Sequence, residues 1–95
     1  MTQMTIRYAG RVQGVGFRAT VAFFSRNHAV VGRVCNCSDG TVQLIAQGDE
    51  TSLLSFKEDI GREMARNIVS AQESWNSISG TDYSEFSIGP DRLVH

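Results

Sequence analysis

The sequence of 95 residues has one proline, two cysteines and no long apolar run. No stretch approaches the roughly 18 apolar residues that a membrane-spanning helix needs. The first residues lack both the basic segment and the apolar stretch of a secretory signal peptide. We therefore expect a cytoplasmic protein with no membrane partner. A chain of this length fits one domain, residues 1–95, and leaves no room for a second.

An excess of charge of either sign is also lacking. Nine lysine and arginine residues stand against ten acidic residues, and the net charge is −1. No basic field exists to attract a nucleic-acid backbone. Arg7 and Arg11 share a strand face without an aromatic residue between them, so the stacking platform of a single-strand binder is missing. We expect a monomer with no nucleic-acid partner.

Cys35 and Cys37 are too few and too far apart for the usual structural roles of cysteine. On a strand both point to the same face, about 6.5–7 Å apart along the chain, which is too far for an unstrained disulfide. Two thiols also fall short of the four ligands of a structural zinc site. The interpretation is a pair of reduced thiols in strand positions. Because no His/Asp/Glu cluster shows ligand spacing either, we expect no metal and no cofactor.

Apolar residues recur with period two in some segments and with helical spacing in others. In the return strand of a hairpin we expect Val42, Leu44 and Ala46 to point inward, and Gln43 and Gln47 outward. The pattern predicts, in chain order, a strand over 5–12, a helix from 17 to about 28, strands over 30–36 and 41–47 joined by an Asp-Gly turn, a helix from Asp49 to Gly61, a strand within 65–78 and a short strand at 86–88.

This βαββαβ order with a short extra C-terminal strand predicts an α+β, ferredoxin-like sandwich, with an antiparallel sheet and two helices on one face. The first two strands would run parallel, with the third between them. The loop after the first strand and the far end of the second then meet at one edge of the sheet. Arg18 and Asn36 are expected together there.

The segment Gly10–Arg18 carries the strongest chemical signal. Its glycines allow sharp turns and close approach to a ligand, and it leads into a helix N-terminus, which favours anions. Arg18 in the first helical turn is unusual, because the helix dipole disfavours cations there; a bound anion would explain it. No Gly-Lys-Ser/Thr follows, so this is not a Walker A loop. A glycine-rich turn with a surface arginine remains the alternative on residues alone.

Gly10-Arg-Val-Gln-Gly-Val-Gly-Phe-Arg18 resembles the first signature of the acylphosphatase family, G-x-V-Q-G-V-x-F-R, at every defined position. Residues 32–42 resemble the second signature, which centres on Asn36, and the resemblance spans about residues 5–88. It implies hydrolysis of the carboxyl–phosphate bond of a small acyl phosphate. Asn36 would orient the attacking water. The substrate phosphate would be bound by Arg18 and by backbone amides of Gln13, Gly14, Val15, Gly16 and Phe17.

The second signature departs from the family pattern at two positions. Arg33 stands where the family usually has an aromatic residue, and Cys35 where it has a basic one. Strand alternation puts both on the face opposite Asn36, so the reaction type is less affected than rate or substrate preference.

Two other functions stay open at this point. One is a non-catalytic ferredoxin-like module that binds an anion or another small ligand. The other is a carbamoyl-phosphate-processing part of a larger maturation assembly.

Overall fold

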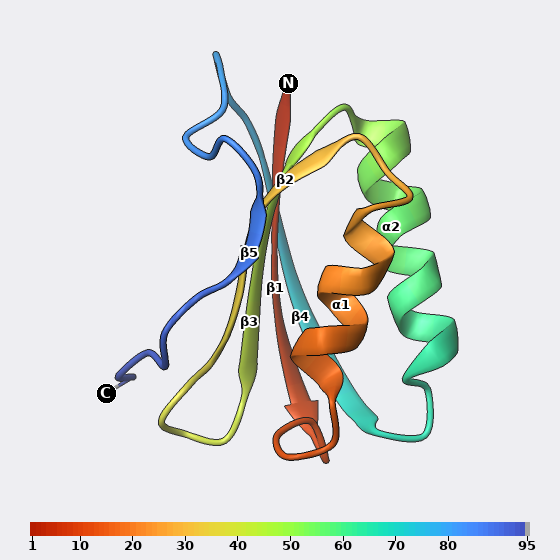
Figure 1. Cartoon of the computed structure of the whole chain (residues 1–95), viewed down its shortest axis with the longest axis vertical. Helices are drawn as coiled ribbons and strands as arrows, with labels where there is room; N and C mark the ends of the chain where they lie inside the picture. The colour runs from red at the N-terminus through yellow and green to blue at the C-terminus, as the bar shows by residue number, and fades with distance from the viewer. Residues whose placement is uncertain (95) are drawn as a thin grey trace.

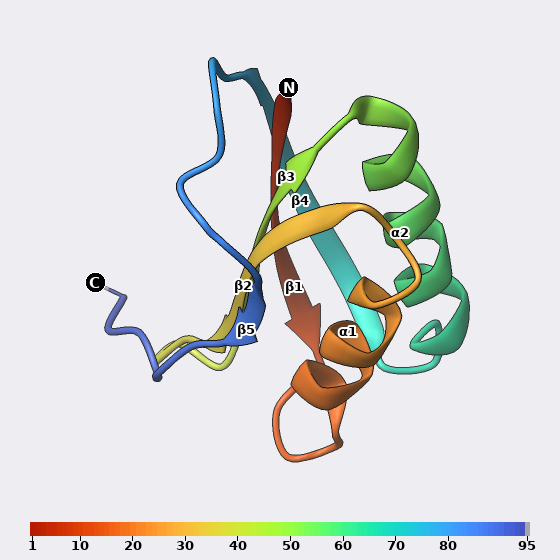
Figure 2. The same ribbon diagram turned by 45° about the horizontal axis from the view of Figure 1, so that its top comes forward.

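A computed structural model describes residues 1–94. The strands in this range form one sheet in the order β4-β1-β3-β2-β5, and both helices cover the same face of it (Figures 1 and 2). The expected ferredoxin-like α+β fold is confirmed. Its elements are β1 (Thr2–Gly10), α1 (Phe17–Ser25), β2 (Val30–Asn36), β3 (Val42–Gly48), α2 (Glu50–Glu63), β4 (Ile68–Ser77) and β5 (Phe86–Ile88).

The pairing of the strands brings two distant loops to one end of the sheet. β1 and β2 each pair antiparallel with β3, so they run parallel to one another. The loop that follows β1 and the hairpin that follows β2 therefore meet at the same end (Figure 1). The four long strands are antiparallel, as expected, whereas the short β5 pairs parallel with β2 and makes that edge of the sheet mixed.

The core lies between the sheet and the helices. Helical spacing of Leu53, Phe56 and Ile60 gives α2 one apolar stripe, and all three are fully buried. Phe56 also meets Phe86 of β5 edge to face, with ring centroids 5.6 Å apart. No helix in residues 1–94 is long and apolar enough to cross a membrane. The buried strand residues that face the helices include Met4, Ile6, Tyr8, Val34, Val42, Leu44 and Ala46.

The boundaries of β1 and α1 differ from those that the periodicity of apolar residues predicts. β1 covers residues 2–10 rather than 5–12, because its pairing with β3 and β4 begins at Thr2. α1 ends at Ser25 rather than near His28. Beyond Ser25 the backbone tightens into three-residue turns, in which the N–H groups of residues 26, 27 and 28 bond to the carbonyls of residues 23, 24 and 25.

Gln47 was expected to point into solvent, and this prediction is wrong. It does lie on the face without helices, but the segment between β4 and β5 covers it completely. Its side-chain amide donates to Gln3 Oε1 at 2.7 Å, and its Oε1 accepts from the Asp82 N–H at 2.8 Å. Buried polar groups need such partners. The sequence pattern could not show a covering segment that lacks a period of its own.

Gly61 was expected to end the second helix, and this prediction is also wrong. α2 continues to Glu63, and the Met64 N–H still bonds to the Ile60 carbonyl at 2.9 Å. A Cβ atom added at Gly61 would meet nothing within 4 Å. The helix tolerates the glycine because its buried stripe, which ends at Ile60, anchors it to the sheet.

Gly61→Ala should therefore stabilise the fold. Alanine adopts the helical conformation at lower entropic cost than glycine, so the free energy of unfolding should rise by about 0.5–1 kcal/mol. Urea denaturation followed by circular dichroism measures this change. A lower midpoint for the variant would show that residue 61 is not in an open helical position.

Candidate active site

The loop between β1 and α1 ends at a helix N-terminus that no side chain caps. Gly14 and Gly16 have φ values of 74° and 80°, a left-handed conformation that glycine adopts readily. Gly16 is the N-cap residue of α1, and neither a capping side chain nor an acidic residue is present in the first turn. The first N–H groups of a helix point outward without intrahelical partners. This end of α1 is therefore receptive to an anion.

The second helix of the same chain shows the contrast. Asp49 caps α2 by accepting the Ser52 N–H at 2.8 Å, and Glu50 adds a carboxylate to the first turn. Hydrogen bonds from Ser52 hold the pKa of Asp49 below its usual value. The positive end of α2 is thus already compensated, whereas the first turn of α1 carries Arg18 instead.

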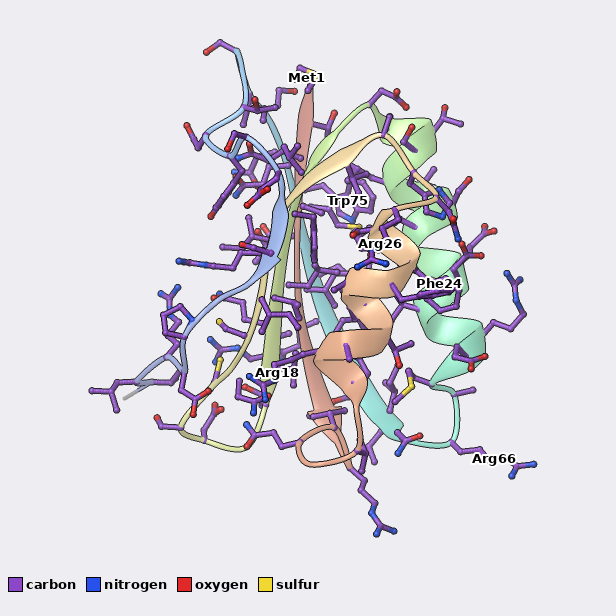
Figure 3. The ribbon with its side chains drawn as sticks, in the orientation of Figure 1. Met1, Arg18, Phe24, Arg26, Arg66 and Trp75 are labelled. Atoms are coloured by element: carbon purple, nitrogen blue, oxygen red, sulfur yellow. The ribbon has the colours of Figure 1, made fainter. Side chains whose placement is uncertain are left out.

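Arg18 extends from the start of α1 toward the sheet edge that carries β5 (Figure 3). Its guanidinium lies 3.8 Å from the carboxylate of Asp91, which is in the segment after β5. The side chains are 36% and 79% exposed, so water screens this ion pair. Sequence reasoning missed Asp91, because it follows the last patterned residue and belongs to neither signature.

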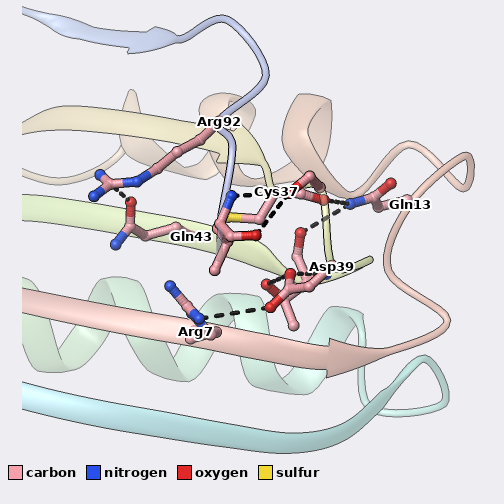
Figure 4. A network of polar contacts seen from close by, with 9 residues as sticks. Arg7, Gln13, Cys37, Asp39, Gln43 and Arg92 are labelled. Carbon is pink, nitrogen blue, oxygen red and sulfur yellow. Dashed lines mark hydrogen bonds and ion pairs between the residues drawn. The ribbon is translucent and has the colours of Figure 1, made fainter.

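The side chain of Gln13 links the loop to the hairpin after β2. Its Nε2 donates to the carbonyl of Cys37 at 2.8 Å and to that of Thr41 at 2.9 Å (Figure 4). Gln13 was expected to contribute its backbone amide to phosphate binding. The side-chain contacts are additional, and the signature spacing did not indicate them. They hold the loop against the hairpin, beside the end of β2.

Asn36 is the last residue of β2 and lies on the helix-covered face of the sheet with Val34. Its side-chain oxygen, Oδ1, is buried and accepts no hydrogen bond from residues 1–94. Its backbone carbonyl accepts from the Arg92 N–H at 2.8 Å. An unpaired buried acceptor costs about 1–3 kcal/mol. Such an atom is an exception, because most buried polar groups have a hydrogen-bond partner.

Two separate hollows adjoin these residues. One, of about 270 Å³, contains Gln13, Asn36, Ser38 and residues 91–93 in its lining. The other, of about 210 Å³, is lined by Val12, Gly14, residues 16–19 and Ile88. The Arg18–Asp91 ion pair joins a residue of the second hollow to a residue of the first.

Arg33 and Cys35, the two departures from the second signature, lie on the face opposite Asn36, as strand alternation predicts. Both cysteines are free and buried. Cys35 occupies a strand position as expected, whereas Cys37 follows the end of β2 in an isolated bridge with Arg92. Burial raises the pKa of the Cys35 thiol, and the neighbouring Cys37 adds to this effect. Cys35 is thus a protonated packing residue. Among residues 1–94, no three His, Cys, Asp or Glu side chains gather at one point.

The fold and the uncapped α1 terminus define a ferredoxin-like domain with an anion-receptive loop. The family model for acylphosphatases matches residues 4–88. The acylphosphatase of Thermotoga petrophila is 33% identical over 88 residues, which make up 93% of this chain and 97% of that protein. The chain belongs to the acylphosphatase family.

Two further comparisons agree with this assignment. The acylphosphatase of Clostridium acetobutylicum is 42% identical over 60 residues. That match covers 63% of this chain and 66% of the relative, slightly under two thirds of its length. The crystal structure of the acylphosphatase from Bacillus subtilis superposes with a TM-score of 0.81 at 33% identity, covering 94% of this chain and 99% of that one.

The Asp91 carboxylate should compete with other anions for Arg18. Asp91→Asn keeps the side chain's shape and removes its charge. An exposed ion pair contributes about 0.2–1 kcal/mol, so inorganic phosphate should bind up to about fivefold more tightly. Calorimetric titration with phosphate at low salt measures this, and the difference should shrink as salt is added.

Glu73→Gln is the matched control, because it removes an ion pair, 3.0 Å from Lys57, that joins α2 to β4 and involves neither Arg18 nor the Gln13 contacts. It should leave phosphate affinity unchanged. If Asp91→Asn also leaves the affinity unchanged at low salt, Asp91 does not compete for the site.

Proposed function

We propose that this protein hydrolyses acyl phosphates to a carboxylate and inorganic phosphate. The observation that carries the proposal is the α1 terminus, which lacks a cap and an acidic residue but places Arg18 in its first turn. Its relatives named as acylphosphatases support the same activity.

In the proposed complex the phosphoryl oxygens accept hydrogen bonds from the backbone N–H groups of residues 13–17. Arg18 adds a planar fork that can contact two oxygens at once. Such donors are preorganised, since the glycine turns and the helix already fix the backbone. They stabilise the charge that develops on the phosphoryl group without reorganising during the reaction.

Asn36 is proposed to hold the attacking water. Asn36 borders the hollow at Gln13 and Ser38, and its side-chain amide offers both donors and an acceptor with which to orient a water there. The water oxygen attacks phosphorus, and the bond from phosphorus to the acyl oxygen breaks. An amide is uncharged and does not remove the water's proton, so a phosphate oxygen of the substrate is the proposed acceptor.

The chemistry of the leaving group explains why so few residues would be enough to catalyse the reaction. A carboxylate leaves as a stable anion, so neither a covalent nucleophile nor a general acid is required. Positioning and electrostatic stabilisation can supply most of the rate. The buried, protonated Cys35 is on the wrong face of the sheet to act as a nucleophile. We expect the reaction to need no metal.

The other two functions can be separated from this one by turnover. A non-catalytic module would bind phosphate and leave acyl phosphates intact. A carbamoyl-phosphate-processing part would favour carbamoyl phosphate strongly over acetyl phosphate. Monomeric state, action in the cytoplasm and the lack of a nucleic-acid partner stay predictions.

The first test compares acyl phosphates, which are mixed anhydrides, with a phosphate monoester. The purified protein should hydrolyse acetyl and benzoyl phosphate, and should leave p-nitrophenyl phosphate essentially untouched, because a monoester demands a nucleophile or metal that we do not expect here. Turnover should survive EDTA. Equal rates on both classes would contradict the assignment, and a loss with EDTA that magnesium or zinc restores would overturn the metal-free expectation.

A second test separates the roles of Arg18 and Asn36. Arg18→Ala removes charge-assisted hydrogen bonds of about 1.5–3 kcal/mol each, so phosphate binding and turnover should both be lost. Asn36→Ala should keep phosphate binding while kcat falls about 100-fold or more, the scale for one preorganised polar group. Arg18→Lys should retain only part of the phosphate binding and turnover that Arg18→Ala loses, because an ammonium lacks the planar fork.

The measurements are phosphate affinity and kcat for each variant, with circular dichroism to verify the fold. Asn36 should behave as a residue that acts mainly in the transition state, and Arg18 as one that acts in both states. Normal kcat in Asn36→Ala would remove Asn36 from the mechanism. Normal phosphate affinity in Arg18→Ala would place the anion site elsewhere.

A further inference from the structure

The two hollows beside the loop differ in the chemistry of their walls. The one at Asn36 contains polar and charged side chains, Gln13, Ser38, Asp91 and Arg92 among them. The one at Ile88 is lined by Val12, Phe17, Ala19 and Ile88 together with loop glycines, and Arg18 is the only charged residue among residues 1–94 that lines it. The Asn36 hollow also includes Leu93, so the two hollows differ mainly in that one has Asp91 and Arg92 in its wall and the other is lined mostly by apolar side chains.

Displacement at phosphorus runs in line, with the attacking and leaving oxygens on opposite sides of the phosphoryl group. In the proposed mechanism the water is at Asn36. The acyl oxygen must therefore leave on the side of the phosphoryl group that faces away from Asn36. Of the two hollows, the one at Ile88 does not contain Asn36 and is lined by Arg18, so it is the hollow that can receive the acyl group.

Ile88 is held in place by the sheet. It is opposite Val34 in the parallel pairing of β5 with β2, and the next N–H, that of Gly89, donates to the Val34 carbonyl at 2.9 Å. Its side chain is nevertheless 46% exposed. A large apolar side chain that is fixed and half exposed beside Arg18 offers a surface that an acyl group can cover.

We propose that Ile88 and Ala19 form the acyl subsite and select short, uncharged, apolar acyl groups. This inference rests on the proposed hydrolysis of acyl phosphates. Within residues 1–94, a second carboxylate on the acyl group would find no cation in this hollow except Arg18, which the phosphoryl group already occupies in the proposed complex. The volume of about 210 Å³ is below the roughly 300–1,000 Å³ of sites for drug-sized ligands, so the acyl group is limited to a short chain or a single ring.

A series of substrates tests the wild-type protein. Butyryl and benzoyl phosphate should show higher kcat/KM than acetyl phosphate, since burying one methylene contributes up to about fourfold. Succinyl phosphate has a carboxylate where butyryl phosphate has a methyl group. It should therefore react at least about tenfold less efficiently than butyryl phosphate.

Two variants test the subsite itself, and both change exposed positions where the fold should tolerate them. Ile88→Ala removes the apolar wall, so the ratio of benzoyl to acetyl kcat/KM should fall about fivefold or more. Ala19→Leu narrows the hollow, so kcat/KM should fall for benzoyl phosphate and stay unchanged for acetyl phosphate. Because neither side chain is proposed to contact the phosphoryl group, the inhibition constant of inorganic phosphate should stay within about twofold, the spread of surface substitutions.

Leu93→Ala is the matched control, because Leu93 is an exposed apolar residue of the other hollow. It should leave the benzoyl-to-acetyl ratio unchanged. A ratio that responds to Leu93→Ala and not to Ile88→Ala would place the acyl group in the Asn36 hollow and overturn the inference. Unchanged ratios in both Ile88→Ala and Ala19→Leu, with normal acetyl phosphate turnover, would also overturn it and leave the proposed function standing. If the wild-type protein hydrolyses no acyl phosphate, the proposed function fails and the subsite assignment fails with it.

Discussion

The side-chain amide of Gln13 is the contact on which the arrangement of the site depends. One nitrogen donates to two carbonyls, at 2.8 and 2.9 Å, and so joins the loop after β1 to the hairpin after β2. The first loop residue, Arg11, bonds to Asn67 through both its N–H, at 2.9 Å, and its carbonyl, at 3.0 Å. Those bonds hold the start of the loop but do not reach the hairpin, so the Gln13 side chain is what fixes the distance of the loop from Asn36. The topology brings the two segments to the same end of the sheet, and Gln13 sets their separation. Gln13 of the first signature thus has a structural role that does not require contact with substrate.

The positive ends of the two helices are compensated to different degrees. Asp49 and Glu50 compensate the positive end of α2, so that terminus contributes to stability alone. At α1 the corresponding compensation is absent, and Arg18 increases the positive potential instead of reducing it. Such an arrangement is unfavourable in the free protein. Asp91 offsets part of that cost through an exposed, screened contact, which an incoming phosphate can replace.

The elements that the sequence predicted well are those governed by local periodicity and turn chemistry. Strand alternation and the Asp39-Gly40 turn placed β2 and its hairpin correctly, because both signals depend on residues that are neighbours in the sequence. The errors arise where distant segments decide the outcome. Gln47 is buried by a segment more than thirty residues later, and Gly61 stays helical because Ile60 packs against the sheet. For the site, the signatures indicated Arg18 and Asn36, but they contained no information about what the C-terminal segment contributes.

The C-terminal segment, β5 and the residues after it, contributes residues to both hollows. It is held in place differently from the loop after β1. β5 and the residues after it run parallel to β2, with backbone bonds from Gly89 to Val34, from Arg92 to Asn36 and from Ser38 to Arg92. These three bonds involve only main-chain atoms, so they do not depend on the side chains of Ile88 and Asp91. Ile88 and Asp91 can therefore change without disturbing the backbone that holds the phosphate loop. Under the proposed function, this separates two tasks: the loop recognises the phosphoryl group that all acyl phosphates share, and the C-terminal segment adjusts the fit of the acyl group.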